Sequence, residues 1–173
     1  MNIAPRPLVA LLFLLVLCPA AAAQETKLSG AFTLDRQASD DVNRVIEAAV
    51  ARMSFVTRPT MRGHLRKTNY VYGRVVISQD VRRVSVKFDS RAPMESPANG
   101  TPVKWEREDG EKVDLSAKSD GGRLVQTLKG EDYERTNTFS LSADGRTLTL
   151  GVVTRNPKLP KPLEYKLVYT RAS

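Results

Sequence analysis

Apolar and polar residues alternate along much of the chain after residue 80. The alternation is strict in segments 84–88, 113–117, 147–152 and 163–170, and a weaker form occupies residues 28–35. Successive side chains of a strand point to opposite faces, so a period of two predicts strands with one packed and one solvated face. The pattern therefore predicts a mainly β protein.

Turn signals separate these segments. Asp-Gly pairs at 109–110, 120–121 and 144–145 favour tight hairpins, because glycine supplies the positive φ angle that such turns need. Residues 91–102 contain three prolines and an Asn-Gly pair, which predicts a long loop. Short strands joined by hairpins predict an antiparallel meander, and we expect it to close into a small β-barrel.

One stretch has helical periodicity instead. Its apolar positions recur every three or four residues and comprise Val42, Val45, Ile46, Ala49, Val50 and Met53. They predict one α-helix over about 39–54, directly after the first strand, with Ser39 as its N-cap and its end before Pro59. We expect its apolar stripe to pack against the barrel.

The first residues have the pattern of a secretory signal peptide. Arg6 precedes an apolar core over 8–17, and a run of small residues over 20–23 precedes Gln24. That core is too short to span a membrane, and no later segment is long and apolar enough to do so. We therefore expect a signal peptide over 1–23 and a single barrel domain over 24–173, exported to the periplasm or the extracellular space.

Charge narrows the choice of partners. The chain carries a formal net charge of +8, and residues 36–83 hold ten Lys or Arg against four acids. A basic surface favours anionic partners. Because export removes the protein from the cytoplasm, we expect no nucleic acid partner; an anionic envelope surface or a small anionic ligand fits better.

Few residues suit catalysis. The chain has one histidine, His64, and its one cysteine, Cys18, lies in the predicted signal peptide. This disfavours the common zinc sites and cysteine nucleophiles, and no nucleophile elbow or phosphate loop occurs. We expect neither a cofactor nor a metal, and no enzyme activity. The enzymatic alternative is an isomerase or hydrolase that uses His64 or the acidic cluster Glu106, Glu108, Asp109, Glu111 and Asp114 near a predicted hairpin.

One segment without acids forms a candidate anion patch. It contains Arg58, Arg62, His64, Arg66 and Lys67. Arginine forks suit carboxylate, sulfate and phosphate groups. The alternative interpretation is a solvated connection between the helix and the next strand.

The strand predicted over 133–141 is unusual. Its alternation places Tyr133, Arg135 and Asn137 on the same face as Phe139, which should be buried. Gln126, between two leucines of the preceding strand, is a similar case. A buried charge needs a partner, so these four polar residues are candidates for ligand binding.

Three explanations remain open for the interior arginine. Its partner is a carboxylate such as Glu131 or Asp132, or it is an anionic ligand, or Arg135 extends to water at the open end of the barrel. Only the second explanation makes Arg135 a binding residue.

The order of elements resembles the lipocalin-like and fatty-acid-binding-like barrels. The opening strand contains Gly30-Ala31-Phe32, a helix follows, and the meander ends in an alternating strand over 163–169. Residues 140–148 are similar to the penultimate hairpin of small exported bacterial proteins of that type. The resemblance implies a small apolar or amphipathic ligand. We thus expect a non-enzymatic binding protein for a small hydrophobic or anionic ligand; the alternative is a cell-envelope interaction protein with a side-chain-filled barrel.

Overall fold

A computed structural model describes residues 28–172, so the predicted signal peptide lies outside the described residues. Ten strands and two helices occur in this range. The strands are β1 (Gly30–Asp35), β2 (Arg74–Gln79), β3 (Arg83–Phe88), β4 (Met94–Pro97), β5 (Val103–Glu106), β6 (Lys112–Asp120), β7 (Arg123–Lys129), β8 (Glu134–Leu141), β9 (Thr147–Arg155) and β10 (Leu163–Arg171). The helices α1 (Val42–Val50) and α2 (Arg58–Thr68) both lie between β1 and β2.

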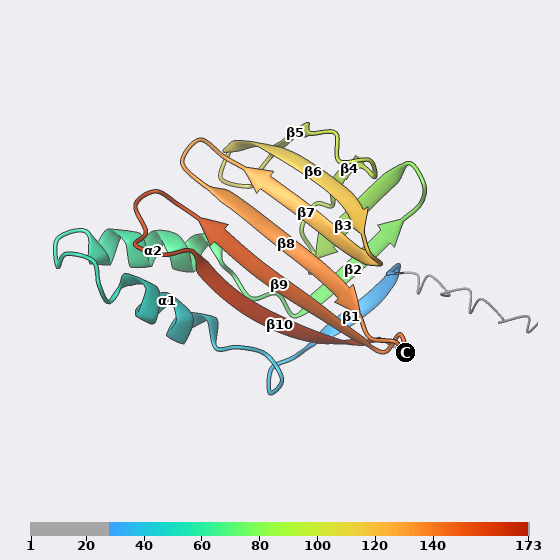
Figure 1. The fold of residues 1–173 in the computed structure, drawn as a ribbon, viewed down its shortest axis with the longest axis horizontal. Coiled ribbons are helices and arrows are strands. Elements are labelled where there is room, and N and C mark those ends of the chain that lie inside the picture. Colours follow the sequence, from blue (N-terminus) through green and yellow to red (C-terminus); the bar gives the residue numbers. More distant parts are fainter. Residues whose placement is uncertain (1–27, 173) are drawn as a thin grey trace, which may run out of the picture.

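All ten strands form one antiparallel sheet in the order β4-β3-β2-β1-β10-β9-β8-β7-β6-β5. The sheet curls into a nearly closed barrel, and the two helices lie together at one end of it (Figure 1). The edges approach each other where Asn99 bridges to Lys118 and where Gln79 Nε2 donates to Ser119 Oγ at 2.6 Å. The predicted mainly β fold, a meander closing into a barrel, is confirmed.

The alternating segments bury the face that their pattern predicts. In β10 the inward residues Leu163, Tyr165, Leu167 and Tyr169 are buried, while Glu164 and Lys166 between them are exposed. The same alternation holds along β3, β6 and β9. Apolar burial is the main driving force for such folding, so the period of two selects the barrel interior.

The predicted hairpins are present, and the predicted long loop is shorter than expected. Gly110 and Gly145 occupy turn positions with φ of 82° and 70°, as tight turns require. Within the expected loop over 91–102, however, Met94–Pro97 forms the edge strand β4, paired with β3. Proline at the end of an edge strand costs no sheet hydrogen bond, which explains why the proline-rich composition was misleading.

Helix α1 is shorter than predicted and is capped by a different residue. Asp41, rather than Ser39, is the N-cap, and its Oδ1 accepts hydrogen bonds from the backbone N–H groups of Asn43 and Arg44. The Ser39 hydroxyl instead donates to the Asp35 carbonyl and accepts from the Val168 N–H at 2.8 Å. Ser39 thus ties the β1–α1 connection to β10.

The predicted apolar stripe of α1 is the face that packs inward. Val42, Ile46 and Val50 are buried, and Val45 and Ala49 are partly buried against the core. This placement agrees with the expectation that the helix packs on the barrel, since α1 lies along β10 (Figure 1).

Helix α2 is the main feature that the sequence pattern missed. Residues 58–68 were expected to continue irregularly after a helix end before Pro59, but Pro59 instead lies in the first turn of a new helix, where proline is well tolerated. Only Met61 and Leu65 of α2 are buried apolar residues. An amphipathic signal of two residues is too weak to detect by periodicity.

Candidate ligand-binding site

A pocket of about 550 Å³ opens at the end of the barrel that α2 covers. The C-terminal half of α2, the β3–β4 connection, the β5–β6 hairpin and the inward faces of β7, β8 and β9 surround it. Its lining residues include Leu65, Lys67, Thr68, Asn69, Tyr72, Phe88, Arg91, Met94, Trp105, Arg107, Glu108, Leu128, Tyr133, Arg135, Asn137 and Thr154. This volume falls in the range of small-molecule sites.

One wall of the pocket is aromatic. The rings of Tyr72 and Phe88 stack with centroids 4.8 Å apart and planes inclined by 27°. Trp105 from β5, with Met94 and Leu128, completes the apolar lining. Such a wall offers dispersion contacts to a ligand. Phe88 and Arg91 already cover the Tyr72 ring, so among residues 28–172 Trp105 is the lining ring that takes part in no ring or cation–π pair.

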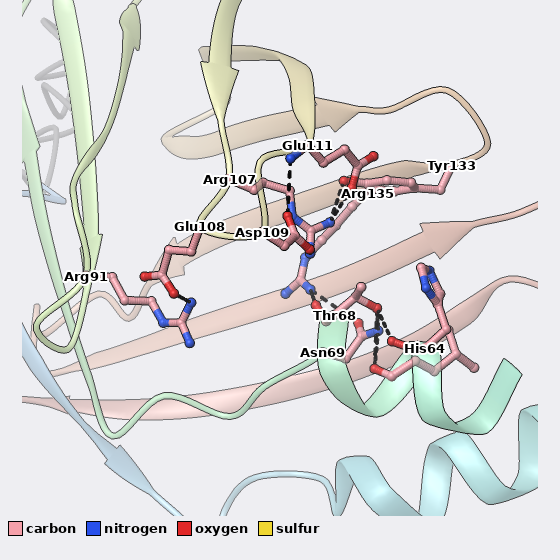
Figure 2. A network of polar contacts seen from close by, with 11 residues as sticks. His64, Thr68, Asn69, Arg91, Arg107, Glu108, Asp109, Glu111, Tyr133 and Arg135 are labelled. Carbon is pink, nitrogen blue, oxygen red and sulfur yellow. Dashed lines mark hydrogen bonds and ion pairs between the residues drawn. The ribbon is translucent and has the colours of Figure 1, made fainter. Parts of the chain in front are cut away.

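Arg135 on β8 points into this pocket toward the end of α2 (Figure 2). Its Nε donates to Asn137 Oδ1 at 2.9 Å, and its Nη1 donates to the Thr68 carbonyl at 3.0 Å and to Asn69 Oδ1 at 3.2 Å. Its Nη2 donates to the Tyr165 hydroxyl at 3.2 Å. The guanidinium is therefore held by neutral oxygens from α2, β8 and β10.

No acid within residues 28–172 neutralises this guanidinium. None of the ion pairs within residues 28–172 involves Arg135, and Asp132 pairs instead with Lys158 at 2.7 Å. The hypothesis that Glu131 or Asp132 is its partner is therefore wrong: the preceding turn directs Asp132 to the β9–β10 connection. A guanidinium has five N–H donors, and four are used here, so one Nη2 hydrogen is unassigned.

A short column of buried amides continues from Arg135 into the core. Asn137 and Gln126 are both buried, and Asn137 Nδ2 donates to Gln126 Oε1 at 3.0 Å. The alternation correctly placed Arg135, Asn137 and Gln126 on the interior side of their strands. By accepting a hydrogen bond from Asn137 Nδ2, Gln126 orients Asn137 Oδ1, which accepts the hydrogen bond from Arg135 Nε.

A second polar group at the pocket has no partner within the described chain. Thr154 lines the pocket, lies opposite Arg135 in the β8–β9 register, and its buried Oγ1 forms no hydrogen bond. An unpaired buried hydroxyl is unfavourable.

Tyr133 contacts Arg107 of the β5–β6 hairpin rather than Arg135. Arg107 on the β5–β6 hairpin donates through Nη1 to the Tyr133 hydroxyl at 2.8 Å and to Glu111 at 3.0 Å, and its Nη2 pairs with Asp109 (Figure 2). Burial raises the pKa of Tyr133, although the hydrogen bond and charge of Arg107 oppose this. Tyr133 is thus a neutral phenol on the rim of the pocket and forms no hydrogen bond to Arg135.

The acidic cluster neutralises neighbouring cations. Burial by itself would lower the pKa of Arg107, but its hydrogen bond to Tyr133 and the charges of Asp109 and Glu111 outweigh burial and raise it. Glu108 pairs with Arg91 of the β3–β4 connection at 2.5 Å, and the Arg91 guanidinium also lies over the Tyr72 ring. Among the pocket's arginines, Arg135 is therefore the one without an acidic partner in the part of the chain that the structure describes.

The five residues of the expected anion patch do not form one surface. Arg62 and Arg66 both pair with Glu47 of α1, at 2.8 and 3.0 Å. Arg58 donates to two backbone carbonyls at the end of α1. Only His64 and Lys67, on another side of α2, line the pocket. The helical period of α2 places these side chains on different sides of the helix. The sequence pattern did not predict this separation because it did not predict α2.

Sequence reasoning also missed Asn69, Thr154 and Tyr165. Asn69 follows the unpredicted helix, and its Oδ1 accepts from both Arg135 and the Tyr165 hydroxyl. Thr154 had one available signal: it is a polar residue on the inward phase of an alternating strand, as Arg135 is. No comparable signal marked Asn69.

Two further observations concern the described range alone. Between residues 28 and 172 no group of three or more His, Asp or Glu residues is arranged to hold a metal ion. Neither α1 nor α2 has the length and apolar character needed to cross a bilayer.

Comparison with known proteins supports the fold. The structure is similar to a REP1-NXSQ fatty acid transporter (15% identity, TM-score 0.52), covering 84% of this chain and 96% of that one. It is also similar to the fatty acid-binding protein of Drosophila melanogaster brain tissue (17%, TM-score 0.52; 81% and 95% covered) and to human cRBP IV (20%, TM-score 0.50; 84% and 98% covered). No family model and no curated protein matches the sequence.

The barrel, its ten antiparallel strands and these likenesses place the chain in the fold class of fatty-acid-binding-like and lipocalin-like β-barrels. Two of these neighbours are named for fatty acids, one as a transporter and one as a binding protein. Fold alone does not determine the ligand, which depends on the pocket.

Proposed function

We propose that this protein binds a small amphipathic molecule whose anionic group lies beside Arg135 and whose apolar part rests on the aromatic wall. The observation that carries the proposal is the Arg135 guanidinium, which faces the pocket and has no acidic partner among the described residues. A partly desolvated cation without a counter-charge favours binding of an anion.

Several features support the same ligand chemistry. The unpaired Thr154 hydroxyl lies opposite Arg135 and can donate to the same anionic group. Tyr72, Phe88 and Trp105 supply the apolar surface. Two structural neighbours are named for fatty acids, which are amphipathic anions of this kind. The proposed activity is binding without chemical conversion.

The second candidate is a cell-envelope interaction protein with a filled barrel. Its support is the packing of the deeper interior, where Phe32, Leu115 and Tyr169 are fully buried. The pocket at the helical end favours the binding protein, because a filled barrel needs no cavity lined by an unneutralised cation. Absence of any ligand binding at the pocket would favour this candidate.

The proposed function is tested with a matched acid and alcohol. Octanoate and 1-octanol share a chain and differ in charge, so their affinities isolate the contribution of the anionic group. Hydrogen bonds to charged groups contribute about 1.5–3 kcal/mol, so octanoate is expected to bind about tenfold to a hundredfold more tightly. Isothermal titration calorimetry measures both. Equal affinities, or no binding of either, would contradict the proposal.

We further propose that the protein acts after export, with residues 1–23 removed as a signal peptide. The basis is the charged, apolar and small-residue order of the first residues. N-terminal sequencing of the protein from its native host is expected to begin at or near Gln24. Retention of Met1, or a lipid on Cys18, would refute export by this route.

A further inference from the structure

The barrel beneath the pocket is closed by a layer of packed side chains. Phe139, one inward position beyond Asn137 on β8, is fully buried. Its neighbours in register, Leu124 on β7 and Leu150 on β9, are at most 1% exposed. The Phe139 ring also reaches the Phe88 ring of β3, with centroids 6.5 Å apart. This layer, called the floor below, spans the barrel from β3 to β9.

The floor limits how far an apolar chain extends from Arg135. An extended acyl chain needs a deep, narrow channel, and the interior beyond the floor holds side chains instead. At the opposite end the chain would meet charged groups at the mouth, among them Lys67 and the Arg91–Glu108 pair. Methylene groups that remain in water contribute no hydrophobic stabilisation.

The pocket's walls suit a different shape. Tyr72 and Phe88 stack on each other, and Trp105 lines the pocket from another strand without a ring or cation–π partner among residues 28–172. Arg135 is the pocket arginine without an acidic partner in that range. Offset stacking on the Trp105 indole is most favourable for another planar ring. A ring that carries a carboxylate places its flat apolar part and its charge within one short molecule, which suits a pocket with the floor beneath it.

From this geometry we infer that the ligand is a compact aromatic anion, and that the floor excludes long acyl chains. The inference rests on the proposed function and goes beyond it, because the proposed function specifies only an amphipathic anion. It also sets this pocket apart from those of the neighbours named for fatty acids, with which the chain shares a fold.

The first test compares 2-naphthoate with dodecanoate by calorimetry. Dodecanoate is the more hydrophobic acid, so a non-selective apolar site would prefer it. We expect 2-naphthoate to bind at least tenfold more tightly. Trp105 is the only tryptophan in the chain and lines the pocket, so a change in its fluorescence locates binding there. Dodecanoate binding as tightly as 2-naphthoate, or more tightly, would overturn the inference.

The second test shortens the central side chain of the floor. Phe139→Ala removes the central side chain of the layer, and dodecanoate affinity is expected to rise at least tenfold while 2-naphthoate affinity changes less than threefold. Leu141→Ala, on the same strand and only partly buried, is the matched control and is expected to change neither. Phe139→Val tests the same direction if the alanine variant does not fold by circular dichroism. A folded variant with unchanged dodecanoate affinity refutes the role of the floor.

Failure of the inference and failure of the proposed function give different results. If acids bind more tightly than alcohols but dodecanoate equals or exceeds 2-naphthoate, the anion site stands and the shape argument fails. If octanoate binds no more tightly than 1-octanol, the proposed function itself fails.

Discussion

Replacing Arg135 with methionine is expected to erase the preference for an acid over its alcohol. Octanoate affinity should fall about tenfold to a hundredfold, because the variant loses the pocket arginine that has no acidic partner among residues 28–172. 1-Octanol affinity should stay within threefold, since methionine keeps the volume of the side chain and the aromatic wall is untouched. Calorimetry with both ligands measures the change.

The matched control removes an arginine elsewhere. Arg83→Met deletes an exposed guanidinium that pairs with Glu95 on the outside of the barrel. It lowers the net charge by the same amount, so it isolates the general electrostatic contribution, which is expected to be small in salt. If Arg83→Met reduces octanoate affinity as much as Arg135→Met does, the effect belongs to net charge and not to the pocket.

A second variant supplies the missing counter-charge in place. Asn69→Asp keeps the oxygen that accepts from Arg135 and from the Tyr165 hydroxyl, and adds a negative charge beside the guanidinium. The internal carboxylate then competes with the ligand, so octanoate affinity should fall as it does in Arg135→Met. Unaltered octanoate affinity in a folded Asn69→Asp variant would show that Arg135 does not recognise the anion.

The stability of Arg135→Met without ligand measures how much Arg135 stabilises the fold, apart from any role in binding the ligand. Arg135 donates to the carbonyl of Thr68 in the last turn of α2, so it also fastens the helix to the barrel. Its loss leaves no unpaired carboxylate, and we expect a decrease of about 1–3 kcal/mol from unsatisfied oxygens. A thermal melt gives this value. The octanol control shows whether that loss of stability disturbs the pocket.

Replacing Ile46 with alanine is expected to lower the free energy of unfolding by about 2–5 kcal/mol. Ile46 is 1% exposed at the centre of the buried face of α1, between Val42 and Val50. The truncation removes apolar contacts and leaves a cavity that the rigid barrel cannot fill. Urea unfolding followed by circular dichroism measures the change.

The control for Ile46 lies on the opposite side of the same helix. Arg44 is exposed, so Arg44→Ala should change stability by less than about 0.5 kcal/mol. An unchanged unfolding midpoint for Ile46→Ala would mean that α1 does not pack on the barrel in solution. Equal losses in both variants would mean that the loss is not specific to the buried face of α1.

The strands of the alternating segments and their inward faces were predictable from the sequence alone, whereas the edge strand β4 was not. Each strand's alternation is a property of neighbouring residues, and burying apolar side chains requires one phase of it to face inward. The same reasoning placed Arg135 and Asn137 in the interior, because they share the phase of Phe139. The presence of interior polar residues was therefore a local property of the chain.

The partners of those residues depended on the tertiary structure. The carboxylate proposed for Arg135 came from the adjacent turn, yet Thr68 and Asn69, about 66 positions away, lie beside it in the fold. Helix α2 positions both, and its two buried apolar residues gave too little periodicity to predict it. Its formation depends on packing against the barrel and on ion pairs with α1.

The sequence by itself determined the meander, the first helix and the inward direction of Arg135, because each follows from residues close together along the chain. Only the tertiary structure decided that α2 covers one end of the barrel, that Thr154 lies unpaired opposite Arg135, and that Phe139 closes the floor. These features join segments distant in sequence, and the register and closure of the sheet set their distances.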